Sequence, residues 1–152
     1  MSVTRKRQGD NVIYTVEGKL DRAEMHRLFD LNYSDYYEIG DAIGAVIDFR
    51  EMSQLTISGL RVAQQRISGV VFNTPVAFVG RADSILLAFL SGFEALSSRG
   101  RRRFRFFRRE EEPVATALAW VDEWFEENNV DREAVRGRVT VNPPLSDNFD
   151  EA

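Results

Sequence analysis

The chain of 152 residues is about the length of one domain, since domains run to roughly 100–200 residues. Its 43% hydrophobic and 29% charged residues are typical of a globular protein, and they exclude collagen-like, low-complexity and wholly disordered chains. It has no cysteine and one histidine, His26, which excludes disulfides, thiolate zinc sites, cysteine nucleophiles and multi-histidine metal sites, and its net charge of −4 argues against general binding of nucleic acid.

The start of the chain predicts a β-hairpin followed by a helix. Apolar and polar residues alternate over residues 12–16, and a strand over residues 2–8 would be joined to them by a turn at 9–11. Asp21, with Glu24 three positions later, matches a capping box, in which carboxylates bind the free amides of a helix's first turn. We therefore expect a helix to begin at Asp21.

A strand, a helix and a second strand are predicted in the middle of the chain. Residues 42–49 are almost continuously apolar, which predicts a strand buried on both faces, and residues 50–56 predict a polar loop. Apolar residues recur at helical spacing from Leu60 to a stop near Gly69. Residues 76–79 predict the next buried strand.

The second half of the chain predicts two helices around a strand. Residues 85–96 predict a helix that is apolar on nearly all sides, and residues 103–108 predict a strand. Pro113 suits the first turn of a last helix. The buried stripe of that helix comprises Val114, Ala117, Leu118, Val121, Trp124 and Phe125. Residues 129–152 predict a C-terminal extension that begins with a short helix or an added strand over 131–141 and ends in a flexible acidic tail.

This order of elements predicts an α/β fold. Strands that alternate with helices favour a parallel sheet with right-handed crossovers, to which an antiparallel first strand can be added. We expect a single domain over residues 1–128, with a mostly parallel sheet of four or five strands and about four helices.

A motif after the predicted strand at 42–49 resembles the signature of the STAS domain, the fold of the anti-sigma-factor antagonists. In that family a strand ending in Asp is followed, after a short loop, by Asp-Ser-Ser-Gly-Leu, which opens a helix. Asp48 matches the strand-end Asp, and residues 58–60, Ser-Gly-Leu, match the second Ser, the Gly and the Leu without a gap. Thr56 and Ile57 stand where the family has Asp and its first Ser.

The resemblance covers most of the chain and carries a functional expectation. The element order from Asp10 to Asn128 resembles the family, and residues 104–120 look most similar to its SpoIIAA-like branch. This implies a non-enzymatic bacterial regulator that acts by partner switching. An unmodified surface binds a regulatory protein, such as a kinase or a regulator of sigma factors, and added phosphate blocks that surface. The implied partner-binding residues are Thr56, Ser58, Gly59 and Leu60.

Ser58 is the candidate phosphorylation site. If Leu60 begins a helix, a phosphate on Ser58 would lie among free backbone amides at the positive end of the helix dipole. Alternatively, Ser58 or Thr56 is only an N-cap hydroxyl, which contributes about 1 kcal/mol to stability. The exposure of the Ser58 hydroxyl decides whether it can act as a switch.

Two other stretches offer candidate surfaces. Residues 99–109 combine arginine with phenylalanine, which suits phosphate backbones and stacked bases, but a strand with packed phenylalanines and solvated arginines also accounts for them. In the apolar helix at 85–96, Leu87, Leu90 and Phe93 would form a hydrophobic interface. That interface would serve a homodimer, or, in the alternative interpretation of the chain as a binding module, a small apolar ligand or lipid.

The sequence predicts no catalytic residue, no cofactor and no metal site. There is no acid, base and nucleophile at a convincing spacing, no glycine-rich phosphate loop, and no further ligand beside the carboxylates at 110–112. The basic start runs into polar residues, unlike a signal peptide, and the longest apolar stretch, residues 85–90, is far short of the ~20 residues that a bilayer requires. We therefore expect a soluble, cytoplasmic protein.

Overall fold

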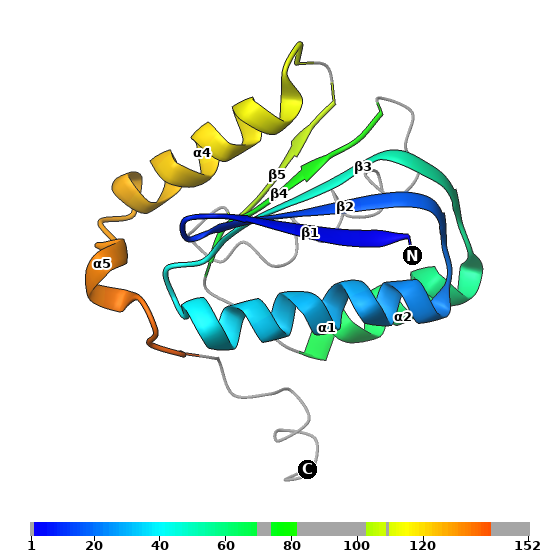
Figure 1. Cartoon of the computed structure of the whole chain (residues 1–152), viewed down its shortest axis with the longest axis horizontal. Coiled ribbons are helices and arrows are strands. Elements are labelled where there is room, and N and C mark those ends of the chain that lie inside the picture. Colours follow the sequence, from blue (N-terminus) through cyan, green and yellow to red (C-terminus); the bar gives the residue numbers. More distant parts are fainter. Residues whose placement is uncertain (1, 70–73, 82–102, 109, 141–152) are drawn as a thin grey trace, which may run out of the picture.

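A computed structural model describes residues 2–69, 74–81, 103–108 and 110–140, and the strands among them form one mixed sheet (Figure 1). The first two strands are antiparallel, and each later strand is parallel to its neighbour. The mostly parallel α/β sheet predicted from the sequence is confirmed. In spatial order, which is also chain order, the strands are β1 (Val3–Gln8), β2 (Asn11–Leu20), β3 (Gly44–Leu55), β4 (Val76–Val79) and β5 (Phe104–Phe107).

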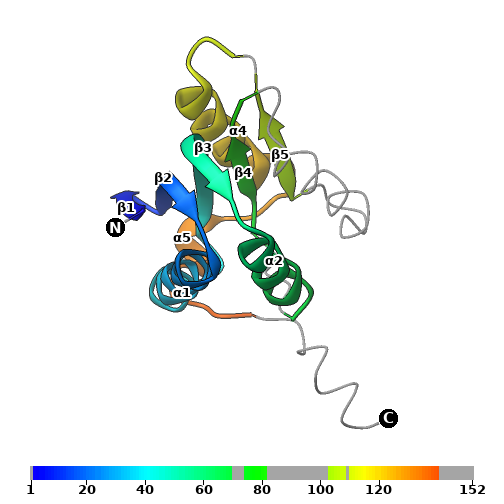
Figure 2. The same ribbon diagram turned by 90° about the vertical axis from the view of Figure 1, so that its right-hand side faces the viewer.

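Helices cover both faces of the sheet. Helices α1 (Arg22–Ile39) and α2 (Ile57–Gly69) lie side by side against one face, and α4 (Pro113–Glu127) covers the other (Figure 2). A single helical turn, α5 (Arg132–Val135), follows α4. The predicted start of α1 is confirmed, because the carboxylate of Asp21 accepts the Glu24 amide at 3.0 Å.

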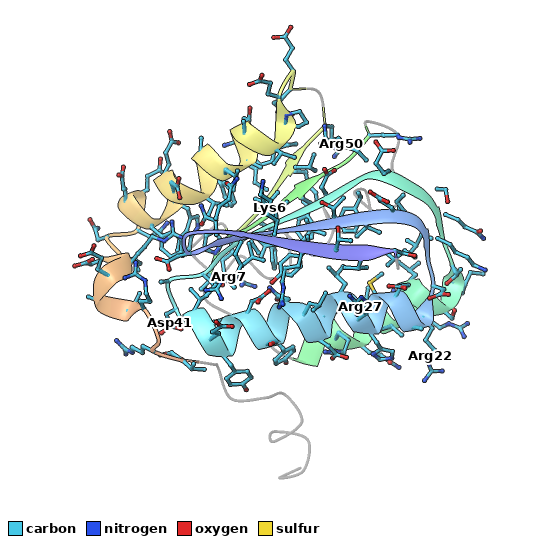
Figure 3. The ribbon with its side chains drawn as sticks, viewed as in Figure 1. Lys6, Arg7, Arg22, Arg27, Asp41 and Arg50 are labelled. Atoms are coloured by element: carbon cyan, nitrogen blue, oxygen red, sulfur yellow. The ribbon has the colours of Figure 1, made fainter. Side chains whose placement is uncertain are left out.

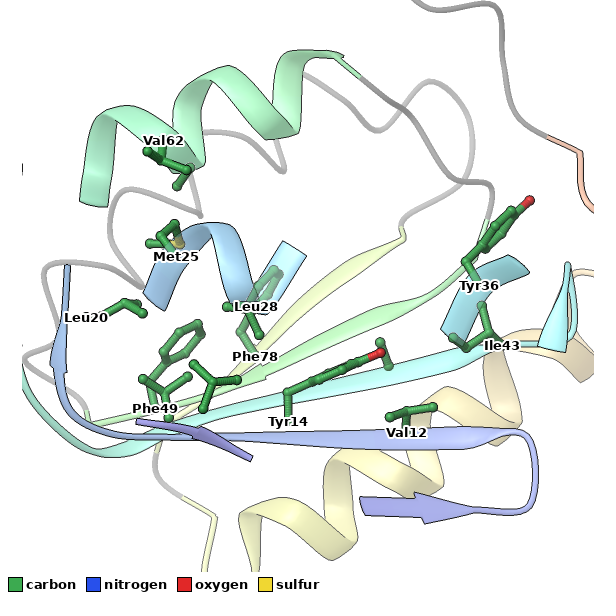
Figure 4. Close-up of a cluster of buried hydrophobic side chains, with 14 of the residues drawn as sticks. Val12, Tyr14, Leu20, Met25, Leu28, Tyr36, Ile43, Phe49, Val62 and Phe78 are labelled. Carbon is green, nitrogen blue, oxygen red and sulfur yellow. The ribbon is translucent and has the colours of Figure 1, made fainter. Parts of the chain in front are cut away.

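Each face of the sheet has its own hydrophobic cluster, because alternate residues of a strand point to opposite sides. On β2, Tyr14 packs toward α1, whereas its neighbour Ile13 packs toward α4. The first cluster includes Val12, Tyr14, Leu20, Met25, Leu28, Phe49 and Phe78 (Figure 4). The predicted stripe of α4 is confirmed in full, since all of its residues belong to the second cluster.

Strands β2 and β3 run farther than predicted. The alternating pattern predicted β2 only over residues 12–16, and residues 50–56 were expected to form a loop, but the two strands stay paired as far as Leu20 and Leu55. β3 last pairs with β4 at Asp48, so beyond that point the two strands continue as a pair, here called the β2–β3 arm (residues 17–20 and 51–55). Its few apolar side chains, Leu20, Met52 and Leu55, are separated by exposed polar ones, so the arm has too little hydrophobic periodicity to detect.

The chain after α4 returns to the opposite end of the sheet from the β2–β3 arm (Figure 1). Residues 131–140, here called the C-terminal strap, are held by polar contacts. The guanidinium of Arg136 donates three bonds, of 2.6, 2.9 and 3.1 Å, to the carboxylate of Asp10, and Arg132 donates to the carbonyl of Ala42 at 2.8 and 3.0 Å. For residues 131–141 the sequence left open a short helix or an added strand. The structure has the short helix, α5, followed by an isolated β-bridge between Arg136 and Gly40.

Candidate functional site

The β2–β3 arm brings the beginnings of α1 and α2 together. At its end the Thr56 amide donates to the Leu20 carbonyl at 3.2 Å, so the two turns that lead into the helices touch. Gly59 makes this approach feasible. A Cβ at this position would lie 2.7 Å from the Leu20 carbonyl oxygen and 3.1 Å from that of Asp21, so any other residue would push the turns apart.

Thr56 is the N-cap of α2. Its hydroxyl accepts the Gly59 amide at 3.0 Å, and its carbonyl accepts the Leu60 amide at 2.9 Å, which is the first helical bond. The helix therefore begins at Ile57 and not at Leu60 as predicted, because the cap lies earlier in the motif. Ser58 is in the first turn, with its hydroxyl oxygen 3.2 Å from that of Thr56.

The two residues after the cap are exposed. The side chain of Ile57 is 73% exposed, an unusual position for a large apolar residue, and Ser58 is also exposed. Thr56 and Leu60 are half-buried and Gly59 is buried. Of the predicted partner-binding residues, Ser58 thus presents its side chain to solvent, while the others shape the turn. Ile57 was missed, and its only signal was its departure from the STAS motif.

Two helix N-termini and two exposed arginines lie at the end of the molecule that carries Ser58. The free amides of two helix N-termini lie at this end of the molecule, and each helix start carries the positive end of its dipole. Arg22, in the first turn of α1, and Arg61, three positions after Ser58, are exposed, and neither forms an ion pair with a residue that the structure describes (Figure 3). The carboxylate of Asp21, which caps α1, opposes them.

His26, on α1, is half-buried. Its Nδ1 lies 3.1 Å from the guanidinium of Arg66 on α2, which also pairs with Asp30 at 2.9 Å and stacks over Phe29. These contacts tie α2 to α1, so the side chain has a structural role.

The remaining sequence candidates are not brought into this site. The helix expected at 85–96, with Leu87, Leu90 and Phe93, lies outside the described residues. Within the described ranges, no three His, Cys, Asp or Glu side chains are grouped so that they could hold a metal ion. Nor is any helix there long and apolar enough to cross a membrane.

Comparisons with known proteins identify the fold. No family model and no curated protein sequence matches the chain. Among solved structures, an anti-sigma factor antagonist from Mycobacterium paratuberculosis is similar with a TM-score of 0.54 and 16% identity, over 79% of this chain and 92% of that one. An uncharacterised DUF3478-family protein with a SpoIIAA-like fold, from Shewanella loihica PV-4, gives 0.50 and 21%, over 78% and 91%. The anti-sigma factor antagonist SpoIIAA in its unphosphorylated form gives 0.51 and 12%, over 77% and 97%.

These similarities establish that the chain has a SpoIIAA-like, STAS-type fold. The fold resemblance that the Asp48 to Leu60 motif suggested is thereby confirmed, although only part of the motif is present.

Proposed function

We propose that this chain is a non-enzymatic regulatory domain that binds a regulatory protein through the start of α2, and that phosphorylation of Ser58 controls the binding. The observation that carries the proposal is the exposed Ser58 hydroxyl in the first turn of α2, directly beside the exposed side chain of Ile57. Two of the similar structures are anti-sigma factor antagonists. The partner class that we propose is accordingly a kinase or another regulator of sigma factors.

Ile57 supplies the affinity in the unmodified state. Burying an isoleucine side chain against a partner contributes about 1.5–3 kcal/mol, and Ile57 has most of its surface available for such burial. Ser58 next to it is small and adds little desolvation cost, so the pair can be covered by a close-fitting partner.

A phosphate on Ser58 weakens binding of the partner. It adds a charge of about −1.5 to −2 at the edge of an apolar contact, where a partner would have to desolvate it. Within the free domain the same phosphate is accommodated, because the first-turn amides of α2 and the guanidinium of Arg61 one turn later favour an anion. Modification thus weakens binding without unfolding the domain.

The first test is the modification itself. The protein isolated from its native cells under several growth conditions is analysed by intact-mass spectrometry and phosphopeptide mapping. We expect one phosphate on Ser58, and its loss in Ser58→Ala. Complete absence of phosphate from Ser58 in all conditions would refute the switch.

The second test is binding of the partner that is captured by the unmodified protein. Ile57→Asp and Ser58→Asp are each expected to weaken binding about tenfold or more. Ser34→Asp is the matched control, because Ser34 is an exposed serine on α1 away from the start of α2, and it should leave affinity unchanged. If all three variants bind as well as the wild type, the start of α2 is not the binding surface.

A further inference from the structure

The outer edge of β1 is open. β1 pairs with β2 on one side only, and no other strand in the described part of the chain lies against it (Figure 1). We propose that this edge is a second protein-binding surface, which accepts an extended acidic segment of a partner protein as an additional strand. The inference is independent of Ser58, which lies on α2.

The phase of the β1–β2 ladder shows which backbone groups are available. The Ser2 carbonyl accepts the Glu17 amide at 2.7 Å, and hydrogen-bonded pairs then recur at every second residue of an antiparallel ladder. The even-numbered residues of β1 therefore bond to β2, whereas the N–H and C=O groups of Arg5 and Arg7 point to the open edge. An incoming strand would find two donors and two acceptors at the spacing it needs.

The edge is held in place by ion pairs to α1. Arg5 donates to Asp35 at 2.8 Å, and this fully buried carboxylate also accepts the Tyr14 hydroxyl at 2.6 Å. Arg7 pairs with Glu38 at 2.7 Å. A strand anchored in this way is preorganised, so an added strand does not have to order it on binding.

The charge of the edge selects the occupant. Lys6 is exposed (Figure 3), with no ion pair to a described residue, and it lies in sequence between Arg5 and Arg7, which are ion-paired to α1. Arg27 on α1 lies near the end of the strand, where its Nε donates to the Val3 carbonyl at 3.4 Å. A second copy of β1 would bring these cations opposite one another, and like charges across a strand pair are destabilising. An acidic strand would pair favourably with Lys6, whose charge no described carboxylate compensates.

The test uses two synthetic peptides, blocked at both ends, with the sequences Glu-Val-Glu-Val-Glu-Val and Lys-Val-Lys-Val-Lys-Val. Amide exchange of the full-length, isotope-labelled protein is followed by NMR. With saturating acidic peptide, we expect exchange of the Arg5 and Arg7 amides to slow about tenfold or more. The Lys6 amide, which is already bonded to β2, should change little. The lysine peptide should bind at least about tenfold more weakly.

Three variants separate backbone pairing from charge. Arg7→Pro removes an outward N–H but no bond to β2 and should abolish binding of the acidic peptide, whereas Arg7→Ala, which keeps the N–H, should retain most of it. Lys6→Glu should weaken the acidic peptide about tenfold and strengthen the lysine peptide. Because Lys6 is exposed, this variant remains informative even if the proline variant unfolds.

Several results would overturn the proposal. The acidic peptide could fail to bind, could bind without protecting Arg5 and Arg7, or could bind no better than the lysine peptide. Concentration-dependent protection of the same amides in the protein alone would assign the edge to self-association instead. None of these results would bear on Ser58, so failure here is distinguishable from failure of the proposed function.

Discussion

Replacing Gly40 with alanine tests how closely the C-terminal strap packs on the rest of the molecule. Gly40 follows α1 with φ 79° and ψ −153°, a conformation that is essentially restricted to glycine. A Cβ at this position would lie 2.5 Å from the Arg138 carbonyl oxygen and 2.7 Å from the Gly137 nitrogen. The substitution therefore strains the backbone and also forces the strap away from α1.

Two contributions determine how much Gly40→Ala lowers the free energy of unfolding. The backbone strain costs about 1–3 kcal/mol. Displacing the strap breaks two backbone hydrogen bonds of 2.7 Å, from Gly137 to the Ile39 carbonyl and from Asp41 to the Arg138 carbonyl, each with a net value of about 0.5–1.5 kcal/mol. We expect the Gly40→Ala variant to lose about 2–6 kcal/mol of its free energy of unfolding.

Urea unfolding measures this loss, and Gly137→Ala is the matched control. Gly137 also has a positive φ, of 84°, but its Cβ would meet no atom within 4 Å, so its replacement should cost only about 1–2 kcal/mol. In Gly40→Ala the amides of Asp41 and Gly137 should also exchange faster. Equal losses in the two variants, with unchanged exchange, would refute the close contact between strap and helix.

Two further predictions concern the cap of α2 and the strap. Thr56→Ala should lower the free energy of unfolding by about 1 kcal/mol, because it removes the N-cap bond, whereas Ser58→Ala should change it by less than about 0.5 kcal/mol. If urea unfolding shows the larger loss for Ser58→Ala, the cap is at Ser58. The hydrogen bond and charge of Arg136 lower the pKa of Asp10 below its ordinary value, so this ion pair stabilises the fold at pH values above the Asp10 pKa of the unfolded chain. That contribution is lost as the pH falls through the lower Asp10 pKa of the folded protein. Arg136→Ala should return the Asp10 pKa toward its ordinary range in an NMR titration, and an unchanged pKa would contradict the pairing.

The sequence predicts well those elements whose side chains have a buried face. The bounds of β4 and the apolar stripe of α4 agree with the structure, because packing against the sheet imposes a regular spacing on apolar residues. The β2–β3 arm was missed because exposed polar side chains interrupt its few apolar ones. The contacts of the strap were missed because Arg132 and Arg136 bind distant partners, the Ala42 carbonyl and Asp10, and no local pattern encodes such pairs.

The sequence predicted that Ser58 lies near the start of a helix, but not how that helix is capped. The motif located Ser58, but the hydroxyl that caps the helix belongs to Thr56, and one residue type serves as well as the other at an N-cap. The exposure of Ile57 could not be predicted either. Large apolar residues are usually buried, and the local sequence carries no signal that Ile57 is 73% exposed.

Helix α1 supports both proposed surfaces. Its start lies against the turn that leads into Ser58, and its side chains hold β1, most firmly through the buried carboxylate of Asp35. Shifting α1 against β1 would take Arg5 and the Tyr14 hydroxyl away from Asp35, and leaving this buried carboxylate without partners costs more than the about 1–3 kcal/mol of an unsatisfied neutral group. Coupling between sites is typically 1–3 kcal/mol, too little to drive such a shift. We therefore expect α1 to act as a rigid support, so that a partner at Ser58 and a strand at β1 bind without affecting each other.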